Sequence, residues 1–297
     1  MTKPAILITG AGGFVGSHLA EGLSRLGYAV TALDRAFDGP TRRRLGGLRL
    51  IEGDLNRETL GCMADEEIKV VIHGAALTTP PELLGISELA HVRHNIDSLI
   101  DTLDVAVANG VECFIFLSSS GVFSFSEADV LDENTVPTGA SAYALAKRAG
   151  EMIAGARPET LILRLGPLYG PHEASRPTRL SISLIGQWLE RARRGDKLEV
   201  SSPLSRRDWT YLPDLAPAVD HLIGVGARGL LHLTSAESVS DLALAEKIAS
   251  RHPGLDLDAA RDGADKRVPM ISRRHELKDF AWTPLELGLQ LTAEAHP

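Results

Sequence analysis

Short apolar runs alternate with longer segments of helical periodicity through the first half of the chain. The apolar runs predict strands at residues 5–9, 28–33, 48–51, 69–73, 111–118 and 160–165. The segments between them predict helices at residues 15–26, 57–64, 86–109 and 142–156. Because parallel strands need crossover connections, which usually contain a helix, this alternation predicts an α/β fold with a doubly wound parallel sheet.

The pattern changes after Leu165, where a turn-rich stretch precedes shorter and more polar elements. These elements predict helices at 180–194, 214–223 and 241–251, strands at 198–201 and 229–234, and a charged tail of low periodicity. We expect a first domain over residues 1–165 and a smaller α/β domain over residues 166–297. Whether elements near residues 205–234 complete the first domain stays open.

A glycine-rich turn directly follows the first predicted strand and opens the first predicted helix. Its G-x-x-G-x-x-G spacing lets the backbone turn sharply and approach a phosphate closely. The start of the helix adds free N–H groups and the positive end of the helix dipole. The turn therefore predicts that the first domain is a dinucleotide-binding Rossmann domain. The residues expected at the phosphates are Gly10, Gly12, Gly13, Phe14, Val15 and Gly16.

Asp34 ends the second predicted strand, about 20 residues beyond the glycine turn. A carboxylate at this place binds the adenosine ribose hydroxyls of NAD and repels the 2′-phosphate of NADP. The neighbouring Arg35 softens that preference. We therefore expect NAD as the cofactor, with Asp34 and Arg35 beside its adenosine ribose.

The composition is ordinary for a globular enzyme, with 44% hydrophobic and 24% charged residues. The formal charge of −8 provides no broad positive field, so we expect no nucleic-acid partner. No apolar run approaches the length of a membrane span, and the N-terminus lacks the pattern of a signal peptide. We expect no membrane partner and a cytoplasmic location.

The only cysteines are Cys62 and Cys113, and neither has metal-ligand spacing around it. We expect buried or incidental thiols in a reducing compartment, and no metal site.

Tyr143 and Lys147 lie four residues apart in a predicted helix, so they share one helix face. A nearby ammonium favours the phenolate form and makes a tyrosine a usable proton acceptor or donor near neutral pH. The helix follows a strand that ends in serines at residues 118–120. The carboxyl end of such a strand is where a doubly wound sheet places its reacting ligand.

Further motifs occur in a fixed order along most of the chain. They are the glycine turn, Asp34, Asp54-Leu55, His73-Gly74-Ala75-Ala76, Asn95, Ser118 to Phe123, Tyr143 with Lys147, Arg164 with Tyr169-Gly170-Pro171, and Arg207-Asp208-Trp209 with Asp214-Leu215. In this combination the chain resembles the extended short-chain dehydrogenase/reductase family, which includes nucleotide-sugar epimerases, dehydratases and sugar dehydrogenases. Motifs that are weak one by one are jointly strong in this order.

The resemblance implies a Ser-Tyr-Lys centre. Tyr143 would exchange a proton with a substrate hydroxyl, Lys147 would tune the phenol and hold the nicotinamide ribose, and Ser119 would donate a hydrogen bond to the same oxygen, with Ser120 as the second choice. Hydride would pass between a substrate carbon and the nicotinamide. By the same resemblance the further cofactor-binding residues would be Asp54 and Leu55 beside adenine, Ala75 and Ala76 beside nicotinamide, and Asn95.

Two departures from the family pattern bear on the substrate. Dehydratases carry an Asp-Glu pair after the catalytic hydroxyl residue, where this chain has Ser120 and Gly121, so dehydration is disfavoured. Pro167 replaces an asparagine that contacts the diphosphate of a nucleotide sugar. The arginines at 176, 179, 206 and 207 are available for a phosphate or carboxylate. The residues expected to bind substrate are Ser119, Ser120, Gly166, His172, Arg179 and Arg207.

The leading prediction is an NAD-dependent sugar or nucleotide-sugar epimerase or oxidoreductase. The first alternative is an NAD-dependent dehydrogenase of a free sugar, a sugar acid or another small carbonyl or alcohol. The second, of another class, is a non-catalytic dinucleotide sensor, which has no need of the Ser-Tyr-Lys set. The resemblance also implies a homodimer that pairs the predicted helices at 86–109 and 142–156. Leu99, Leu103 and Val107 have the spacing for that contact, and equally for packing on the sheet.

Overall fold

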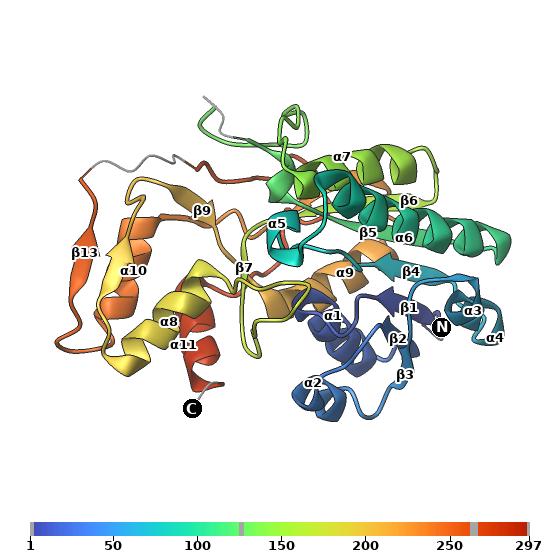
Figure 1. The fold of residues 1–297 in the computed structure, drawn as a ribbon, viewed down its shortest axis with the longest axis horizontal. Helices are drawn as coiled ribbons and strands as arrows, with labels where there is room; N and C mark the ends of the chain where they lie inside the picture. The colour runs from blue at the N-terminus through green and yellow to red at the C-terminus, as the bar shows by residue number, and fades with distance from the viewer. Residues whose placement is uncertain (1–2, 125–127, 262–266, 296–297) are drawn as a thin grey trace.

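A seven-stranded parallel sheet forms the centre of the molecule in the computed structural model, which describes residues 3–124, 128–261 and 267–295 (Figure 1). The strand order is β11-β6-β5-β4-β1-β2-β3. The strands are β1 (Ile6–Thr9), β2 (Val30–Asp34), β3 (Arg49–Glu52), β4 (Val70–His73), β5 (Cys113–Ser119), β6 (Thr160–Leu165) and β11 (Gly229–Leu233). All seven lie within two residues of the predicted strands, so the doubly wound parallel sheet is confirmed.

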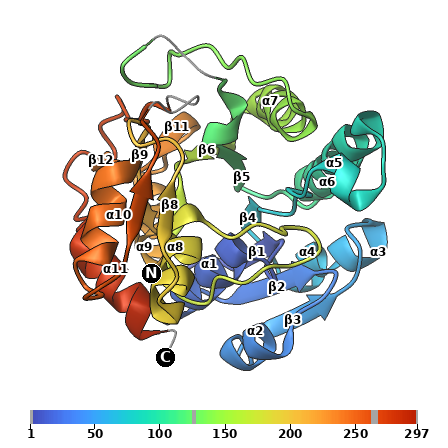
Figure 2. The ribbon, with the colours of Figure 1, turned by 60° about the vertical axis from the view of Figure 1, so that its left-hand side comes forward.

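Helices cover both faces of the sheet (Figures 1 and 2). On one face α1 (Phe14–Arg25) packs beside α9 (Leu215–Gly224) over a core of fully buried side chains such as Ile8 and Leu163. On the other face α6 (Glu88–Ala108) packs beside α7 (Ala142–Gly155). The chain passes from β1 outward to β3 and then returns to β4 on the other side of β1. Ligands of open α/β sheets bind at such a switch point, outside the carboxyl ends of the strands.

A second hydrophobic core lies away from this sheet, among elements of the second half of the chain. It joins α8 (Leu184–Arg194), α10 (Asp241–Ala249) and α11 (Leu285–Glu294), seen together at the left of Figure 1. Three two-stranded pairs accompany these helices. They are β7 (Leu168–Tyr169) with β10 (Thr210–Tyr211), β9 (Arg206–Asp208) with β12 (Ser238–Ser240), and β8 (Leu198–Val200) with β13 (Leu257–Ala259). Between β10 and β12 the chain returns to the main sheet through α9 and β11.

Several expected boundaries differ from the structure. The single helix expected at 57–64 is two short helices, α3 (Arg57–Leu60) and α4 (Cys62–Asp65), which meet at Gly61. The helix expected from residue 180 begins only at Leu184, because the side chain of Ser183 caps it. Short helices α2 (Gly39–Arg44) and α5 (Pro81–Leu84), and the 3-10 turns η1 (Ser120–Val122) and η2 (Leu212–Asp214), were not anticipated.

The expectation of a tail without periodic structure was wrong for α11. Leu285, Leu289 and Thr292 fall on one buried helix face, although leucines at every second position mimic a strand pattern. A side chain at Gly288 would come within 2.0 Å of the Tyr169 hydroxyl, so α11 lies directly against that ring. Residues 262–266 and 296–297 of this tail lie outside the described part of the chain.

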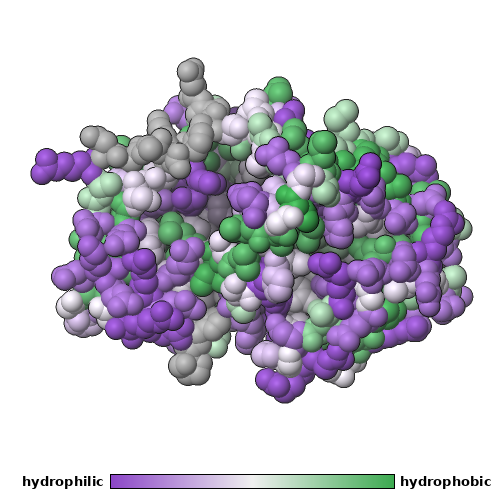
Figure 3. All heavy atoms as spheres, viewed as in Figure 1, coloured by the Kyte–Doolittle hydropathy of each residue, from purple (hydrophilic) through white to green (hydrophobic). Residues whose placement is uncertain are grey.

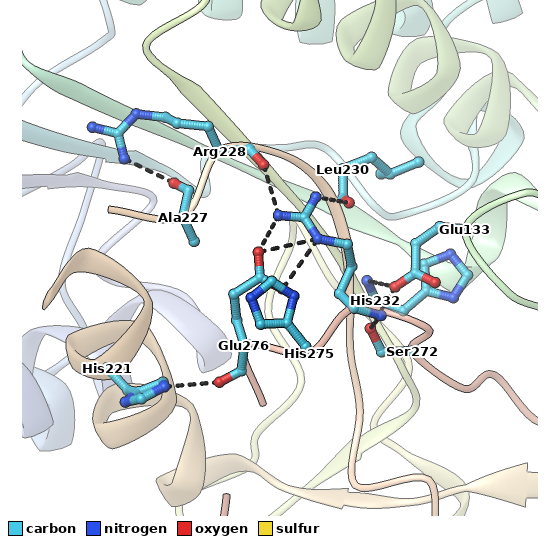
Figure 4. Close-up of polar contacts among 10 residues, drawn as sticks. Glu133, His221, Ala227, Arg228, Leu230, His232, Ser272, His275 and Glu276 are labelled. Carbon is cyan, nitrogen blue, oxygen red and sulfur yellow. Dashed lines mark hydrogen bonds and ion pairs between the residues drawn. The ribbon is translucent and has the colours of Figure 1, made fainter. Parts of the chain in front are cut away.

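The segment before α11 covers the exposed edge of β11, the last strand of the sheet (Figure 4). Arg274 donates hydrogen bonds to the carbonyl oxygens of Leu230 and Arg228, and it is ion-paired with Glu276. Glu133 accepts hydrogen bonds from the backbone N–H of His232 and from the hydroxyl of Ser272. An unpaired strand edge invites association with other chains, and here side chains occupy its polar groups.

Within the described residues, no helix combines the length and the apolar character needed to cross a membrane. On the face shown in Figure 3, hydrophobic side chains gather near its centre, over the region of α5 in Figure 1. In and next to α5, the hydrophobic side chains of Leu83, Ile86 and Leu89 are exposed.

Replacing Glu133 by alanine tests the cover over β11. Three donors lose their acceptor, namely the N–H groups of His232 and Arg273 and the hydroxyl of Ser272. We expect the free energy of unfolding in urea to fall by about 1–3 kcal/mol. The control is Asp104→Ala, which removes an exposed ion pair to Arg57 and should change stability by less than about 0.5 kcal/mol. Equal losses in the two variants would contradict this role of Glu133.

Candidate active site

A cavity of about 620 Å³ lies at the carboxyl ends of the central strands. Its walls come from the turn after β1, the ends of β2 and β5, the loops after β3 and β4, helices α6 and α7, and the segments that follow β6 and β7. This volume is within the range typical of ligand sites. The cavity therefore lies where the topology of the sheet predicts a ligand.

The glycine turn forms one end of the cavity. Gly10 has φ of +71°, and a Cβ at Gly16 would lie 2.2 Å from the carbonyl oxygen of Gly10. The turn thus allows α1 to start directly behind β1, where no side chain fits between them. Gly13 caps α1, with no side-chain hydrogen bond to the first turn and no acidic residue there. The first N–H groups of α1 are therefore available to an anion such as a diphosphate, which is the group this end must hold to bind a dinucleotide.

Asp34 and Arg35 line the cavity at the end of β2. The carboxylate Oδ2 of Asp34 accepts a hydrogen bond of 2.9 Å from the N–H of Gly12. Burial raises the pKa of Asp34, and the N–H of Gly12 partly opposes that rise. The contact ties the end of β2 to the glycine turn.

Ser119, Tyr143 and Lys147 come together on the cavity wall. Ser141 caps α7, so Tyr143 stands in its first turn and Lys147 one turn later on the same face. Tyr143 and Ser119 are hydrogen-bond partners. Burial raises the pKa of the Tyr143 phenol, and the bond to Ser119 and the charge of Arg179 lower it in part. The phenol of Tyr143, which can donate or accept a proton, therefore lies on the cavity wall with the hydroxyl of Ser119 beside it.

The ammonium of Lys147 is buried and donates a 2.7 Å hydrogen bond to the carbonyl oxygen of Leu117. Burial lowers the pKa of Lys147 to about 8, against the charge of Glu151, which raises it. The carboxylate of Glu151 accepts hydrogen bonds from Nε and Nη2 of Arg164, at 2.8 and 2.7 Å. It also accepts one from the hydroxyl of Ser118, at 2.6 Å. A buried ion pair thus stands one helical turn beyond the lysine.

Glu151 was missed in the sequence although a signal for it exists. Tyr143, Lys147 and Glu151 follow one another at intervals of four, so all three share a face of α7. Its partner Arg164 has no such signal, because it lies 13 residues later, in β6, and only the packing of α7 on β6 brings it to Glu151.

Most residues expected to bind the cofactor line the cavity. Besides Ser119, Tyr143 and Lys147, the predicted residues found on its walls are Gly10, Gly13, Phe14, Val15, Gly16, Asp34, Arg35, Asp54, Leu55, Ala75, Ala76, Gly166 and Arg179. The walls also include residues that the sequence did not single out as site residues: Leu33, Gly53, Gly74, Leu77, Thr78, His94, Asp97, Ser98, Asp101, Leu117, Ser118, Leu165, Leu168, Ala174, Arg176 and Thr178. Some of these residues lie at the ends of strands β2, β5 and β6, four lie on α6, and the others lie in β7 and in connecting segments, so only their place at the sheet edge reveals them.

Five predicted residues lie outside the cavity lining: Gly12, Asn95, Ser120, His172 and Arg207. Gly12 supports Asp34 through its N–H, and Asn95 holds the loop after β4 by bonding both backbone groups of Leu77. The ring of His172 lies 6.0 Å from that of His18. Arg207 makes a bidentate ion pair with Asp241, at 2.8 and 2.9 Å. The structure therefore gives Arg207 a partner within the chain.

Residues 6–230 match the model of the NAD-dependent epimerase/dehydratase family. The chain belongs to this family. The resemblance inferred from the motifs is thereby confirmed, and the protein is an enzyme with NAD as its cofactor.

Similar proteins cover almost the entire chain of this family member. A dTDP-4-dehydro-6-deoxy-D-allose reductase from a Streptomyces species is 28% identical over 97% of this chain and 94% of its own. The structure of MoeE5 in complex with UDP-glucose and NAD is 28% identical, with a TM-score of 0.78 over 98% of each chain. The UDP-glucose 4-epimerase of Thermotoga maritima, with UDP-glucose, is 22% identical with a TM-score of 0.82 over 98% of each chain, and shares the fold.

Replacing Glu151 by glutamine tests the buried ion pair. The guanidinium of Arg164, whose side chain is 4% exposed, loses its countercharge, so we expect a loss of about 3–5 kcal/mol in unfolding free energy. The pKa of Lys147 should fall below about 8, because the charge that raises it is gone. Urea unfolding and an NMR titration of the lysine check the two effects.

The matched control replaces both partners, as Glu151→Met with Arg164→Leu. Because no unpaired charge is left in the core, the double variant should recover most of the lost stability. A double variant as unstable as Glu151→Gln would show that the ion pair is not the cause.

Proposed function

We propose that the protein is an NAD-dependent epimerase of a nucleotide sugar, which inverts a hydroxyl-bearing carbon through a transient ketone. The observation that carries the proposal is the meeting of Ser119, Tyr143 and Lys147 on the wall of a cavity whose other end has the glycine turn and Asp34. A sensor that only binds dinucleotide needs no such centre. The arrangement suits proton transfer at an oxygen whose carbon exchanges hydride with the nicotinamide.

In this proposal Tyr143 takes the hydroxyl proton of the substrate and later returns it. Ser119, its hydrogen-bond partner, donates to the same substrate oxygen. Lys147 favours the phenolate by its charge, since its Nζ lies 5.9 Å from the centre of the Tyr143 ring, and it holds the nicotinamide ribose. When bound, NAD supplies the acceptor and donor of hydride.

The cofactor residues proposed are those of the glycine turn, Asp34 and Arg35 at the ribose, and the loops after β3 and β4. Gly166 and Arg179, which also line the cavity, are proposed on the substrate side. We divide the chain accordingly. Residues 1–165, with elements near 205–234, would hold NAD, and most of residues 166–297 would hold the substrate. The return of α9 and β11 to the main sheet supports this division.

Epimerisation is favoured over dehydration because Ser120 and Gly121 occupy the positions of the dehydratase Asp-Glu pair, and neither carries an acid or base. The class of substrate is supported by MoeE5, whose structures contain UDP-glucose or UDP-glucuronic acid with NAD. The name of the Streptomyces relative, dTDP-4-dehydro-6-deoxy-D-allose reductase, supports the same class of substrate.

A second candidate is an NAD-dependent dehydrogenase of a free sugar or sugar acid. Pro167 has no side-chain donor for a diphosphate, and Arg207 is occupied by Asp241. These two observations favour a substrate without a nucleotide. A dehydrogenase releases NADH after each turnover, whereas an epimerase regenerates NAD in place.

Incubation of the purified protein with UDP-glucose or UDP-glucuronic acid tests the proposal. We expect the 4-epimer as product, NAD retained in stoichiometric amount, and no accumulation of NADH. Tyr143→Phe should lower turnover by about 10²–10⁴-fold, because the proton acceptor is lost. Phe280→Tyr, at a ring that packs against Trp282 away from the cavity, is the control and should leave turnover unchanged. NADH accumulation with free sugars alone would favour the dehydrogenase, and full activity of Tyr143→Phe would overturn the catalytic assignment.

We also propose a homodimer, and a cytoplasmic location in keeping with the free thiols of Cys62 and Cys113. Leu99 packs on the sheet, but Ile100, Leu145 and Met152 are exposed on the adjacent helices α6 and α7. Pairing these helices with those of a second copy would cover the exposed side chains. Light scattering should give the mass of a dimer for the native chain and of a monomer for Met152→Glu, and a monomeric native chain would exclude the dimer.

A further inference from the structure

A strap formed by residues 172–180 connects β7 to α8 and runs across the mouth of the cavity. Figure 2 shows this yellow-green segment in front of the carboxyl ends of β1 and β4. Ala174, Arg176, Thr178 and Arg179 of the strap line the cavity. The strap therefore forms part of the wall that a bound dinucleotide would meet.

The strap is fastened on the side of β4. The N–H groups of Thr78 and Thr79 donate to the carbonyl oxygen of Thr178, at 3.0 and 3.1 Å. The hydroxyl of Thr79 donates to the carbonyl oxygen of Pro177 at 2.9 Å. Between these contacts, Arg176 and Arg179 exchange two backbone hydrogen bonds and close a tight turn.

Arg176 fastens the strap on the opposite side, beyond β2. Its Nη2 donates to the carboxylate of Asp38 at 2.8 Å and to the hydroxyl of Thr41 at 2.9 Å. The guanidinium of Arg179 lies 5.0 Å from the centre of the ring of Phe14, the first residue of α1. The strap thus bridges the two sides of the switch point above the start of α1.

Arg176 has hydrogen-bond donors left over. Its Nε and Nη1 are buried and have no hydrogen-bond partner among the residues that the structure describes, although the residue lines the cavity. A buried donor of a charged group without a partner is unfavourable, so a site of this kind favours an anionic acceptor. Next to it, Arg44 bonds Ser17 of α1, and burial together with Arg44 lowers the pKa of His18 to about 3. His18 is therefore neutral, and the positive charge here is carried by arginines.

We propose that Arg176 binds the diphosphate of NAD from above, opposite the first N–H groups of α1, and that its bond to Asp38 closes the strap over the cofactor. The ligand class is a dinucleotide diphosphate, whose oxygens suit the planar donors of a guanidinium. The inference deepens the proposed function and rests on it in one respect, because an epimerase has to retain NAD through turnover. Arg176 then binds the diphosphate and, through Asp38, also holds the strap over it.

The diphosphate of a nucleotide-sugar substrate is the other source of the same chemistry. Arg176 is bound to Asp38, which follows the strand that ends in the predicted ribose ligand Asp34, whereas Ser119 and Tyr143 mark the substrate end. This position favours the diphosphate of NAD over the diphosphate of a nucleotide sugar as the group that Arg176 binds. The experiment separates the two sources by measuring NAD and UDP independently.

Release of NADH from the full-length protein is the main measurement. The protein is loaded with NADH, excess NAD is added, and the loss of bound NADH fluorescence gives the dissociation rate without any sugar present. We expect Arg176→Ala to accelerate release by about tenfold or more, because charge-assisted hydrogen bonds to the diphosphate are lost. Arg194→Ala, at an exposed arginine on α8, is the matched control and should release NADH at the native rate.

Asp38→Asn tests the contact between Arg176 and Asp38 separately from the contact between Arg176 and the diphosphate. Asparagine also caps helices well, so α2 keeps the N-cap that Asp38 provides through Thr41. Asp38→Asn should accelerate the release of NADH. The double variant with Arg176→Ala should release NADH no faster than Arg176→Ala alone, because both changes remove the same contact. This second variant also keeps the test open if Arg176→Ala does not fold.

The affinity of UDP for the NAD-loaded protein is measured in parallel and should be the same in Arg176→Ala and the native chain. Native release rates in both Arg176→Ala and Asp38→Asn would overturn the proposal. Weakened UDP binding with unchanged NADH release would assign Arg176 to the substrate instead and overturn it as well. Because no sugar is turned over, these outcomes are distinct from a failure of the proposed epimerase activity.

Discussion

The close approach of α1 to the end of β1 is the constraint on which the rest of the structure depends. A Cβ at Gly16 would lie 2.2 Å from the carbonyl oxygen of Gly10, so only glycine lets the central strand turn directly into the helix. That turn places the first residues of α1 on the cavity wall with no side-chain cap, and the N–H of Gly12 holds the carboxylate of Asp34. One backbone geometry therefore sets both the predicted anion site and the position of the predicted ribose ligand.

At the other end of the cavity, buried charged side chains lie against strands β5 and β6 of the same sheet. The ammonium of Lys147 is held by the carbonyl oxygen of Leu117 at the end of β5, and Glu151 with Arg164 forms a buried ion pair one turn beyond. Buried charges are tolerated only when they are paired and hydrogen-bonded. The helix that presents Tyr143 is thereby held in place by polar contacts as well as by apolar packing. The strap then joins the two ends, through Arg176 to Asp38 and through Thr178 to the loop after β4.

The motifs that were predictable from the sequence are local ones. The strand, turn and helix around Gly10, and the spacing of Tyr143 and Lys147, are contained in short segments whose periodicity and glycines specify their geometry. The strap could not be recognised in the same way. Residues 172–180 have no periodic pattern, and their contacts join positions about 100 to 140 apart, such as Arg176 with Asp38, 138 residues away. The arginines of the second half show the same limit, because Arg207 is paired with Asp241, and of the arginines described there only Arg176 and Arg179 line the cavity.

The sequence by itself determined the parallel sheet, the positions of its strands along the chain, and the residue types for a dinucleotide and for proton transfer. These depend on period-2 and period-3.6 patterns and on glycines, which act over a few residues. Only the tertiary structure decided that α9 and β11 return to the main sheet, that α11 packs its Gly288 against Tyr169, and which arginines line the cavity. An arginine has the same sequence signature whether it is paired or open to a ligand. Its partner is chosen by packing between distant segments, and no local pattern records that choice.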